Sequence, residues 1–340
     1  MATFKQIRGQ TIKKYTTNPT NPLEGQMWYN NTTGTLKVYR NLGGTWSSGG
    51  ALNTAVVAVG GWGPQTAATV AGGNSPTYPP ATGATQLYDG STWTTSPASL
   101  SPGRSEGGTS QAGTQTAAWY SGGVSPSPPR INITSDFDGS AWTTGGVYPL
   151  SISMAGAGTA TAGLGFGGYQ PATPEMFKRT TNEYDGSTWT AANNMNTGRA
   201  QNNTGGIGLQ TAALTAAGTS GPPAPLTNMV NCESYDGSTW SVENALPVGR
   251  SANGLFGTTA AAQIFGGRTP PVPTISDTTT TWDGTSWAAS PATLATARVS
   301  MAAAGTTGTA GLCAGGSPST LDVVEEYTDP TIGIQTVTTS

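Results

Sequence analysis

The chain has 340 residues, 9% of them charged, with a formal net charge of −3 and no histidine. Without histidine there can be no Ser-His-Asp or Cys-His catalytic arrangement, no histidine-based metal site and no histidine general base. The 49 glycines, and the lack of a long apolar pattern with the 3.6-residue period of a helix, indicate an all-β protein. No run of 18 apolar residues occurs that could span a membrane.

Residues 1–24 are predicted to form an extended polar arm, because two Asn-Pro steps favour turns and oppose a helix. Residues 1–40 hold six basic residues and one acidic residue, whereas the remaining chain holds eight bases and sixteen acids. A solvated extension and an arm that docks on an acidic protein surface both fit this charge. The bases are few and not clustered with aromatic residues, so nucleic acid is not an expected partner.

Residues 25–48 are predicted to hold three strands separated by an Asn-Asn-Thr-Thr-Gly turn and an Asn-Leu-Gly-Gly turn. The last of these strands contains Trp46. The sequence leaves open whether residues 35–40 also join the larger structure that follows.

A heptapeptide, clearest as residues 184–190 (Tyr-Asp-Gly-Ser-Thr-Trp-Thr), recurs along the rest of the chain. An Asp-Gly pair between aromatic runs is typical of a tight hairpin turn, so its aspartate is interpreted as a turn former and its tryptophan as a packing residue. The tryptophans follow one another after 47, 49, 47, 51 and 47 residues. The repeated residues are Trp46, Trp93, Trp142, Trp189, Trp240 and Trp287, with Asp89, Asp138, Asp185, Asp236 and Asp283.

Each period also contains a small-residue strand that ends in a Gly-Gly or Ala-Gly pair, preceded in most copies by a Gly-x-x-Thr-Ala turn. Each period therefore holds four short strands, a to d. In the second period these are residues 104–113, 116–123, 131–137 and 141–143. Six such periods predict a six-bladed β-propeller over residues 49–330, with four antiparallel strands per blade.

The last period begins at Ala297-Arg298 and stops at Asp329 without a strand d. Open strand edges promote aggregation, so a propeller must cover them. We therefore predict that the N-terminal strand around Trp46 completes this last blade. Residues 331–340 are expected to form a C-terminal tail.

The Gly-Gly pairs, the Tyr-Asp at the end of strand c, the tryptophan in strand d and an arginine that opens strand a together resemble the kelch repeat, over roughly residues 45–330. The first and third blades lack the arginine. The resemblance implies that arginine, tyrosine and tryptophan have structural roles. The arginines are Arg104, Arg199, Arg250 and Arg298.

A second resemblance lies near the start, in residues 4–15, in Gly-Gln-Met-Trp-Tyr-Asn at 25–30 and in Gly-Thr-Leu-Lys-Val-Tyr at 34–39. These segments resemble the opening of tailed-phage virion proteins, among which those of marine phages and cyanophages carry similar Thr/Ala/Gly-rich kelch-like repeats. The resemblance implies a structural protein displayed outside the virion, on tail or capsid. It would be a homo-oligomer or present in several copies, and residues 1–24 would attach it to other virion proteins.

The connections between strands b and c vary in sequence and hold fifteen of the 24 prolines. Strand alternation places them on one face with the d–a connections. Such loops either bind a ligand, for which a host-surface glycan or protein is the expected class, or serve as solvent-exposed spacers. The candidate binding residues on this face are Tyr78, Arg130, Tyr169, Phe177, Lys178 and Arg268.

The rival enzymatic interpretation is a sialidase-like glycan hydrolase, because Asp-Gly-Ser-Thr-Trp superficially resembles the Asp-box of sialidases. In that box, however, a residue separates Asp from Gly, and no two carboxylates are paired here as glycosidic cleavage requires. We expect no enzymatic activity, cofactor or metal. The predicted function is a tail fibre or other adhesion appendage, with a capsid decoration protein as the alternative. Cys232 and Cys313 are expected to be buried and not disulfide-bonded.

Overall fold

The computed structural model shows a chain built from β-strands. The residues it describes are 12–20, 22, 25–40, 43–75, 81–127, 129–171, 173–200, 205–221, 227–271, 274–319, 321–329 and 333–337. Among these residues there is a short 3-10 turn, η2 (Gln65–Ala67), and no α-helix, so the predicted all-β class is confirmed. The same part of the chain contains no helix long and apolar enough to cross a membrane.

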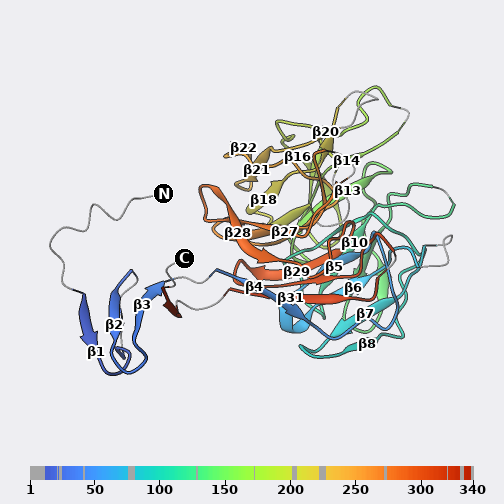
Figure 1. Cartoon of the computed structure of the whole chain (residues 1–340). Coiled ribbons are helices and arrows are strands. Elements are labelled where there is room, and N and C mark those ends of the chain that lie inside the picture. Colours follow the sequence, from blue (N-terminus) through green and yellow to red (C-terminus); the bar gives the residue numbers. More distant parts are fainter. Residues whose placement is uncertain are drawn as a thin grey trace. The chain divides into compact units, whose positions relative to one another are not determined.

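The chain divides into two compact units, which are described separately (Figure 1). The larger unit is Thr45–Thr328. The smaller unit combines Met1–Gly44 with Asp329–Ser340. Each unit has its own sheets.

The smaller unit is one sheet with the strand order β1-β2-β3-β32. β2 (Met27–Asn30) and β3 (Thr35–Arg40) form an antiparallel hairpin, as the sequence predicts. β1 (Lys13–Tyr15) pairs parallel to β2, and β32 (Gly333–Thr336) pairs antiparallel to β3. Figure 1 shows β3 in blue beside the dark red C-terminal strand.

The sheet of the smaller unit differs from the predicted arm and tail. Residues 13–15 were predicted to belong to an extended arm and residues 333–336 to a C-terminal tail, but they form the two outer strands of this sheet. The β2–β3 hairpin alone would leave two open edges of backbone N–H and C=O groups, and the added strands satisfy them. Residues 35–40 pair within this sheet and not within the larger unit, which answers the question left open by the sequence.

The larger unit contains six four-stranded antiparallel sheets among its described residues, numbered here along the chain. Sheet 1 is β5 (Gly60–Trp62), β6 (Thr69–Ala71), β7 (Thr85–Tyr88) and β8 (Trp93–Thr95). Sheet 2 is β9 (Gly108–Thr109), β10 (Ala118–Ser121), β11 (Thr134–Phe137) and β12 (Trp142–Thr144). Sheet 3 is β13 (Ser153–Gly158), β14 (Gly163–Tyr169), β15 (Thr181–Tyr184) and β16 (Trp189–Ala192).

The remaining sheets repeat this order. Sheet 4 is β17 (Gly206–Leu209), β18 (Ala212–Ala216), β21 (Cys232–Tyr235) and β22 (Trp240–Glu243). Sheet 5 is β23 (Gly254–Gly257), β24 (Ala262–Phe265), β27 (Thr278–Trp282) and β28 (Trp287–Thr293). Sheet 6 is β29 (Ala302–Thr307), β30 (Ala310–Ala314), β31 (Val324–Thr328) and β4 (Thr45–Ser48). Two small ribbons, β19 (Thr219–Ser220) with β20 (Thr227–Asn228) and β25 (Arg268–Thr269) with β26 (Thr274–Ile275), extend the connections between second and third strands.

Sheet 6 is completed from the other end of the larger unit, as predicted. β4 pairs antiparallel with β31 and places Trp46 opposite Tyr327. The ring of Trp46 packs on Phe265, with 4.7 Å between ring centroids, so β4 also fills the space between sheets 5 and 6.

The first strands of successive sheets contact one another, in the order β5, β9, β13, β17, β23, β29, and β29 also contacts β5. Small residues permit this approach. A Cβ atom on Gly156 would lie 2.4 Å from the carbonyl oxygen of Thr109, so only glycine lets β13 come so close to the backbone of sheet 2. The result is a propeller-like arrangement of four-stranded sheets.

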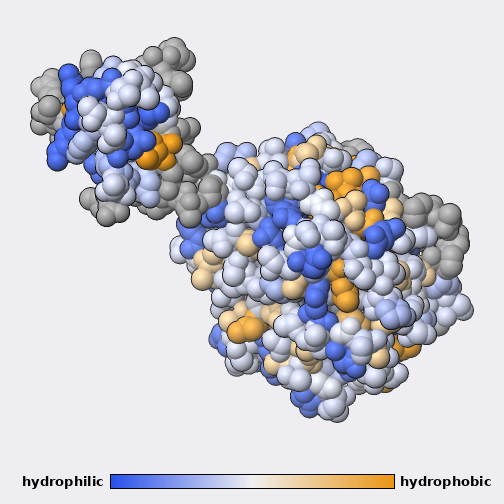
Figure 2. Space-filling view, turned by 90° about the horizontal axis from the view of Figure 1, so that it is seen from below, coloured by the Kyte–Doolittle hydropathy of each residue, from blue (hydrophilic) through white to orange (hydrophobic). Residues whose placement is uncertain are grey.

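The hydrophobic core lies between the sheets. Buried apolar residues form six clusters, each with members from two successive sheets, sheets 6 and 1 included. Figure 2 shows one face of the larger unit, on which hydrophobic side chains form small separate patches among hydrophilic ones. Cys232 and Cys313 are buried and free, as predicted.

Candidate functional site

The repeated aspartates close the turns between third and fourth strands. Oδ1 of Asp185 accepts hydrogen bonds from the backbone N–H groups of Ser187 and Thr188, at 2.8 and 2.7 Å. The same geometry occurs at Asp89, Asp138, Asp236 and Asp283. Backbone hydrogen bonds from Thr92 and Ser91 lower the pKa of Asp89 to about 2. These carboxylates are therefore stabilised in the charged form, as expected of turn formers.

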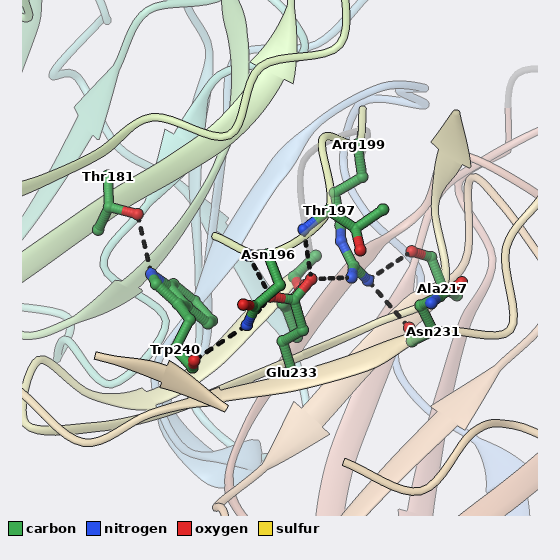
Figure 3. A network of polar contacts seen from close by, with 10 residues as sticks. Thr181, Asn196, Thr197, Arg199, Ala217, Asn231, Glu233 and Trp240 are labelled. Atoms are coloured by element: carbon green, nitrogen blue, oxygen red, sulfur yellow. Dashed lines mark hydrogen bonds and ion pairs between the residues drawn. The ribbon is translucent and has the colours of Figure 1, made fainter. Parts of the chain in front are cut away.

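The repeated tryptophans join neighbouring sheets. Nε1 of Trp240 in sheet 4 donates a hydrogen bond to Oγ1 of Thr181, the first residue of β15 in sheet 3, at 2.9 Å (Figure 3). The same bond joins Trp142 to Thr85 at 2.9 Å, Trp189 to Thr134 at 2.8 Å and Trp46 to Thr279 at 2.9 Å. Each bond spans two successive sheets, so these residues are structural.

Two sheets lack the threonine acceptor. Sheet 4 has Cys232 at this position, where the thiol lies near the indole of Trp287, and burial raises the pKa of the thiol to about 12. Sheet 6 has Val324, which packs in one cluster with Trp93. Nε1 of Trp93 is buried and has no hydrogen-bond partner in the described part of the chain.

In four of the sheets, an arginine just before the first strand hydrogen-bonds to residues of its own sheet. In sheet 4 the Nη1 atom of Arg199 donates to the carbonyl oxygens of Ala217 and Asn231, at 3.1 and 2.9 Å (Figure 3). Its Nη2 lies 2.6 Å from Oε1 of Glu233, and both side chains are buried. The backbone N–H of Asn196 donates to Oε2 of Glu233 at 2.7 Å, so this carboxylate is held from two sides.

The four arginines differ in the residue they meet in the third strand. Arg298 forms a second buried ion pair with Glu325. Arg104 donates instead to Oγ of Ser135 at 2.9 Å, and Arg250 donates to Oγ1 of Thr280 at 3.1 Å. Without a carboxylate partner, burial lowers the pKa of Arg104 and of Arg250 to about 10. All four guanidinium groups thus bind within their own sheets.

Three of the predicted binding residues form one cluster. Cζ of Arg130 lies 5.1 Å from the ring centroid of Tyr169, and that ring lies 5.6 Å from the ring of Phe177. Arg130 comes from the β10–β11 connection of sheet 2, whereas Tyr169 and Phe177 flank the β14–β15 connection of sheet 3 and pair through a backbone bridge. We call these residues the Arg130 cluster. Phe177 is buried, and the other two are half-buried.

The other predicted binding residues lie outside this cluster of stacked side chains. Lys178 follows Phe177, and its Nζ donates to Oγ1 of Thr173 at 3.3 Å within the same connection. Arg268 is exposed on the β25–β26 ribbon of sheet 5, where its carbonyl oxygen accepts a hydrogen bond from Nδ2 of Asn228 at 3.0 Å. Tyr78 lies outside the described residues.

An exposed ion pair that was not predicted from the sequence lies in the β14–β15 connection. Arg179 and Glu175 lie 3.4 Å apart in the same connection. Within the described ranges, no three Asp, Glu or Cys side chains lie together as a metal site would require.

A cavity of about 280 Å³ occurs at the other end of the sheets, next to the turns between first and second strands. It is lined by Gln111, Ala112, Gly208, Leu209, Gly257, Thr258, Gly305 and Thr306. No prediction from the sequence included this cavity. A signal was present, because the strand register places Gln111 at the position that Gly158, Gly208 and Gly257 occupy in sheets 3, 4 and 5.

Comparison with protein-family models finds no match to this chain, and comparison with curated protein sequences finds none either.

Proposed function

We propose that the chain is a non-enzymatic structural protein of a bacteriophage virion, a tail fibre or similar adhesion appendage. Its larger unit would be a closed six-bladed kelch-like propeller that presents the connections between second and third strands to a host surface. The Arg130 cluster is the observation that carries this proposal. The phage assignment rests on the resemblance of the N-terminal segments.

Contacts between the first and last sheets support a closed ring. Nε2 of Gln65 in sheet 1 donates to the carbonyl oxygens of Gly311 and Tyr327 in sheet 6, at 3.1 and 2.9 Å. The hydroxyl group of Tyr88 in sheet 1 also hydrogen-bonds to Glu326 in sheet 6. Gln210 and Tyr235 of sheet 4 make the corresponding hydrogen bonds to sheet 3. Sheets 1 and 6 therefore contact each other in the same way as two sheets that follow one another along the chain.

The chemistry of the Arg130 cluster suits a glycan. An aromatic face packs against the C–H groups of a sugar ring, and a guanidinium group beside it can donate to hydroxyl or carboxylate oxygens. The two flanking connections come from neighbouring sheets, so the rigid sheets fix the distance between them. This arrangement is typical of a preformed binding surface, which loses little conformational entropy on binding.

The smaller unit is proposed to attach the protein to other virion proteins. Residues 1–24 were expected to make this attachment, and part of that segment, β1, belongs to the sheet of this unit. The unit carries Lys13, Lys14 and Lys37, whereas acids outnumber bases in the rest of the chain. An acidic surface on the particle would therefore be a complementary partner.

The test of adhesion uses the full chain and the double variant Arg130→Ala/Tyr169→Ala. Labelled protein is added to cells that the particle infects, and the bound fraction is measured. We expect the variant to bind at least about tenfold more weakly, because side chains at the centre of a binding surface carry most of its energy. The control is Arg179→Ala, which removes an exposed arginine of the same connection. Unchanged binding of the double variant, with an unchanged unfolding temperature, would contradict the proposal.

Two alternatives are separated by other measurements. A capsid decoration protein would appear on the head and not on the tail in a cryo-EM map of the particle. A glycan hydrolase would release reducing sugar from host polysaccharide.

A further inference from the structure

The basic residues of the larger unit fall into two groups. Four of the eight are the buried arginines that bind within their own sheets, Arg104, Arg199, Arg250 and Arg298. The other four all lie in connections between second and third strands, and these are Arg130, Lys178, Arg179 and Arg268. Every basic side chain of this unit that reaches solvent is therefore at one end of the sheets.

The opposite end of the same sheets carries negative charge. The five repeated aspartates of the turns between third and fourth strands are all exposed there. Because the charges of the larger unit are separated in this way, an anion is repelled from the end with the aspartates and attracted to the other. The charge distribution therefore favours an anionic partner at the end that holds the Arg130 cluster.

The positive charge at that end is concentrated beside the Arg130 cluster. The connections between second and third strands of sheets 2 and 3 hold three bases and one acid, whereas those of the other four sheets hold one base and two acids. The acid in sheet 3 is Glu175, which pairs with Arg179. Glu106, which precedes the first strand of sheet 2, accepts a hydrogen bond from Oγ of Ser153 at 3.0 Å. Neither carboxylate forms an ion pair with Arg130.

The guanidinium group of Arg130 has neither an ion pair nor a hydrogen bond in the described part of the chain, and its Cζ lies 5.1 Å from the ring centroid of Tyr169. Nε is buried, but Nη1 and Nη2 are not among the buried atoms without a partner, so these two groups reach solvent. A guanidinium group beside a ring keeps the N–H groups in its own plane free to donate two parallel hydrogen bonds to a carboxylate.

We infer that the Arg130 cluster binds an acidic glycan, with a sugar carboxylate accepting hydrogen bonds from Nη1 and Nη2 of Arg130 and the sugar ring beside Tyr169. Lys178 adds a second positive charge in the neighbouring connection. The inference rests on the proposed function, which takes the ligand of this end to be on a host surface, and narrows that ligand to sugars that carry carboxylates.

The inference is tested by isothermal titration calorimetry on the full chain. The probes are tetramers of galacturonate, glucuronate and mannuronate, each compared with its methyl ester, which has the same backbone without the charge. We expect at least one acid to bind at least about tenfold more tightly than its ester, because hydrogen bonds to charged groups are stronger than those to neutral ones. An absence of this preference for all three acids would overturn the inference.

Variants locate the preference. Arg130→Gln keeps a hydrogen-bond donor but removes the charge, and it should abolish the preference for the acid. Arg130→Lys keeps the charge without the planar fork, so it should retain part of the preference and a folded protein. The matched control is Arg268→Gln, which removes an exposed charge at the same end but in sheet 5, and it should bind like the unchanged protein. Equal losses in Arg130→Gln and Arg268→Gln would show that only overall charge matters and would refute the site.

Failure of this inference is distinguishable from failure of the proposed adhesion. Host-cell binding that requires Arg130 and Tyr169, but that the esters inhibit as well as the acids do, would support adhesion and overturn the acidic ligand. Preferential binding of an acid by a protein that does not bind host cells would support the acidic site and contradict adhesion.

Discussion

Trp93 is the one repeated tryptophan that packs against an aliphatic side chain where other sheets supply a hydroxyl or a thiol. The threonines that accept from Trp142, Trp189, Trp240 and Trp46 all lie three residues before the aromatic residue that ends the third strand of the preceding sheet. Val324 stands at this position in sheet 6 and leaves the indole N–H of Trp93 buried without a partner in the described chain. The energetic cost of the missing hydrogen bond to Trp93 can therefore be measured by substituting Val324.

We predict that Val324→Thr raises the free energy of unfolding by about 1 kcal/mol, because the new hydroxyl group gives the buried indole N–H an acceptor. Chemical denaturation of the full chain measures the change. The control is Val70→Thr, in the same apolar cluster, which should lower stability because it buries a hydroxyl group in a packed core. Destabilisation of the same size by both substitutions would show that Trp93 gains no hydrogen bond.

At the scale of a strand and its neighbours, the buried ion pairs of sheets 4 and 6 contrast with the neutral contacts of sheets 2 and 5. Arg199 is nearly inaccessible, and burial lowers its pKa, while Glu233 opposes that shift. The pair therefore stabilises the fold only while both charges are present, since either one alone would be a buried, uncompensated charge.

We predict that Glu233→Leu lowers the free energy of unfolding by about 3–5 kcal/mol, because it leaves the guanidinium group of Arg199 without its counter-ion. The double variant Arg199→Met/Glu233→Leu should recover part of this loss. Urea denaturation of the single and double variants completes a double-mutant cycle. If the two single losses simply add in the double variant, the ion pair contributes no coupling and the prediction is wrong.

The repeats show which elements a sequence can predict. The heptapeptide predicted the hairpin of the third and fourth strands, and the Gly-Gly pair predicted the end of the second strand. Both predictions were possible because a turn and its flanking strands are local in sequence. β1 and β32 were not predicted, since they are short strands whose pairing partners lie elsewhere in the chain. Likewise, Arg130 and Tyr169 could be named as loop residues, but their stacking depends on how two sheets are placed.

The unsatisfied oxygen of Gln111, a buried Oε1 without a hydrogen-bond partner in the described chain, is another feature that depends on how distant segments of the chain are placed. The carbonyl oxygens that accept from Nε2 of Gln111, those of Ala303 and Leu255, lie more than a hundred residues away, and only the folded chain brings the three segments together. An unusual polar residue in a row of small ones was visible in the sequence. The cavity beside it was not.

At the scale of the whole molecule, the chain crosses from one compact unit to the other just before β4, after Gly44. β4 is the first element of the larger unit in sequence, yet it completes the last sheet by pairing with β31. The smaller unit, by contrast, obtains its outer strands from both ends of the chain. The two ends of the chain thus belong to one unit, and the residues that complete sheet 6 belong to the other.

We predict that a chain limited to residues 45–328 unfolds at the same temperature as the larger unit of the full protein, because all six of its sheets stay whole. A chain limited to residues 49–328 should be less stable by at least about 3–5 kcal/mol, the usual cost of removing a large buried aromatic side chain. It loses Trp46 from the contacts with Phe265 and Tyr327 and exposes the edge of β31, which should also cause association. Thermal unfolding and size-exclusion chromatography of the two truncated chains measure both effects.

Trp46→Ala in the full chain is the matched control, since it removes the side chain but keeps the strand, and it should lower stability without association. Equal unfolding temperatures for the two truncated chains would show that β4 does not stabilise sheet 6.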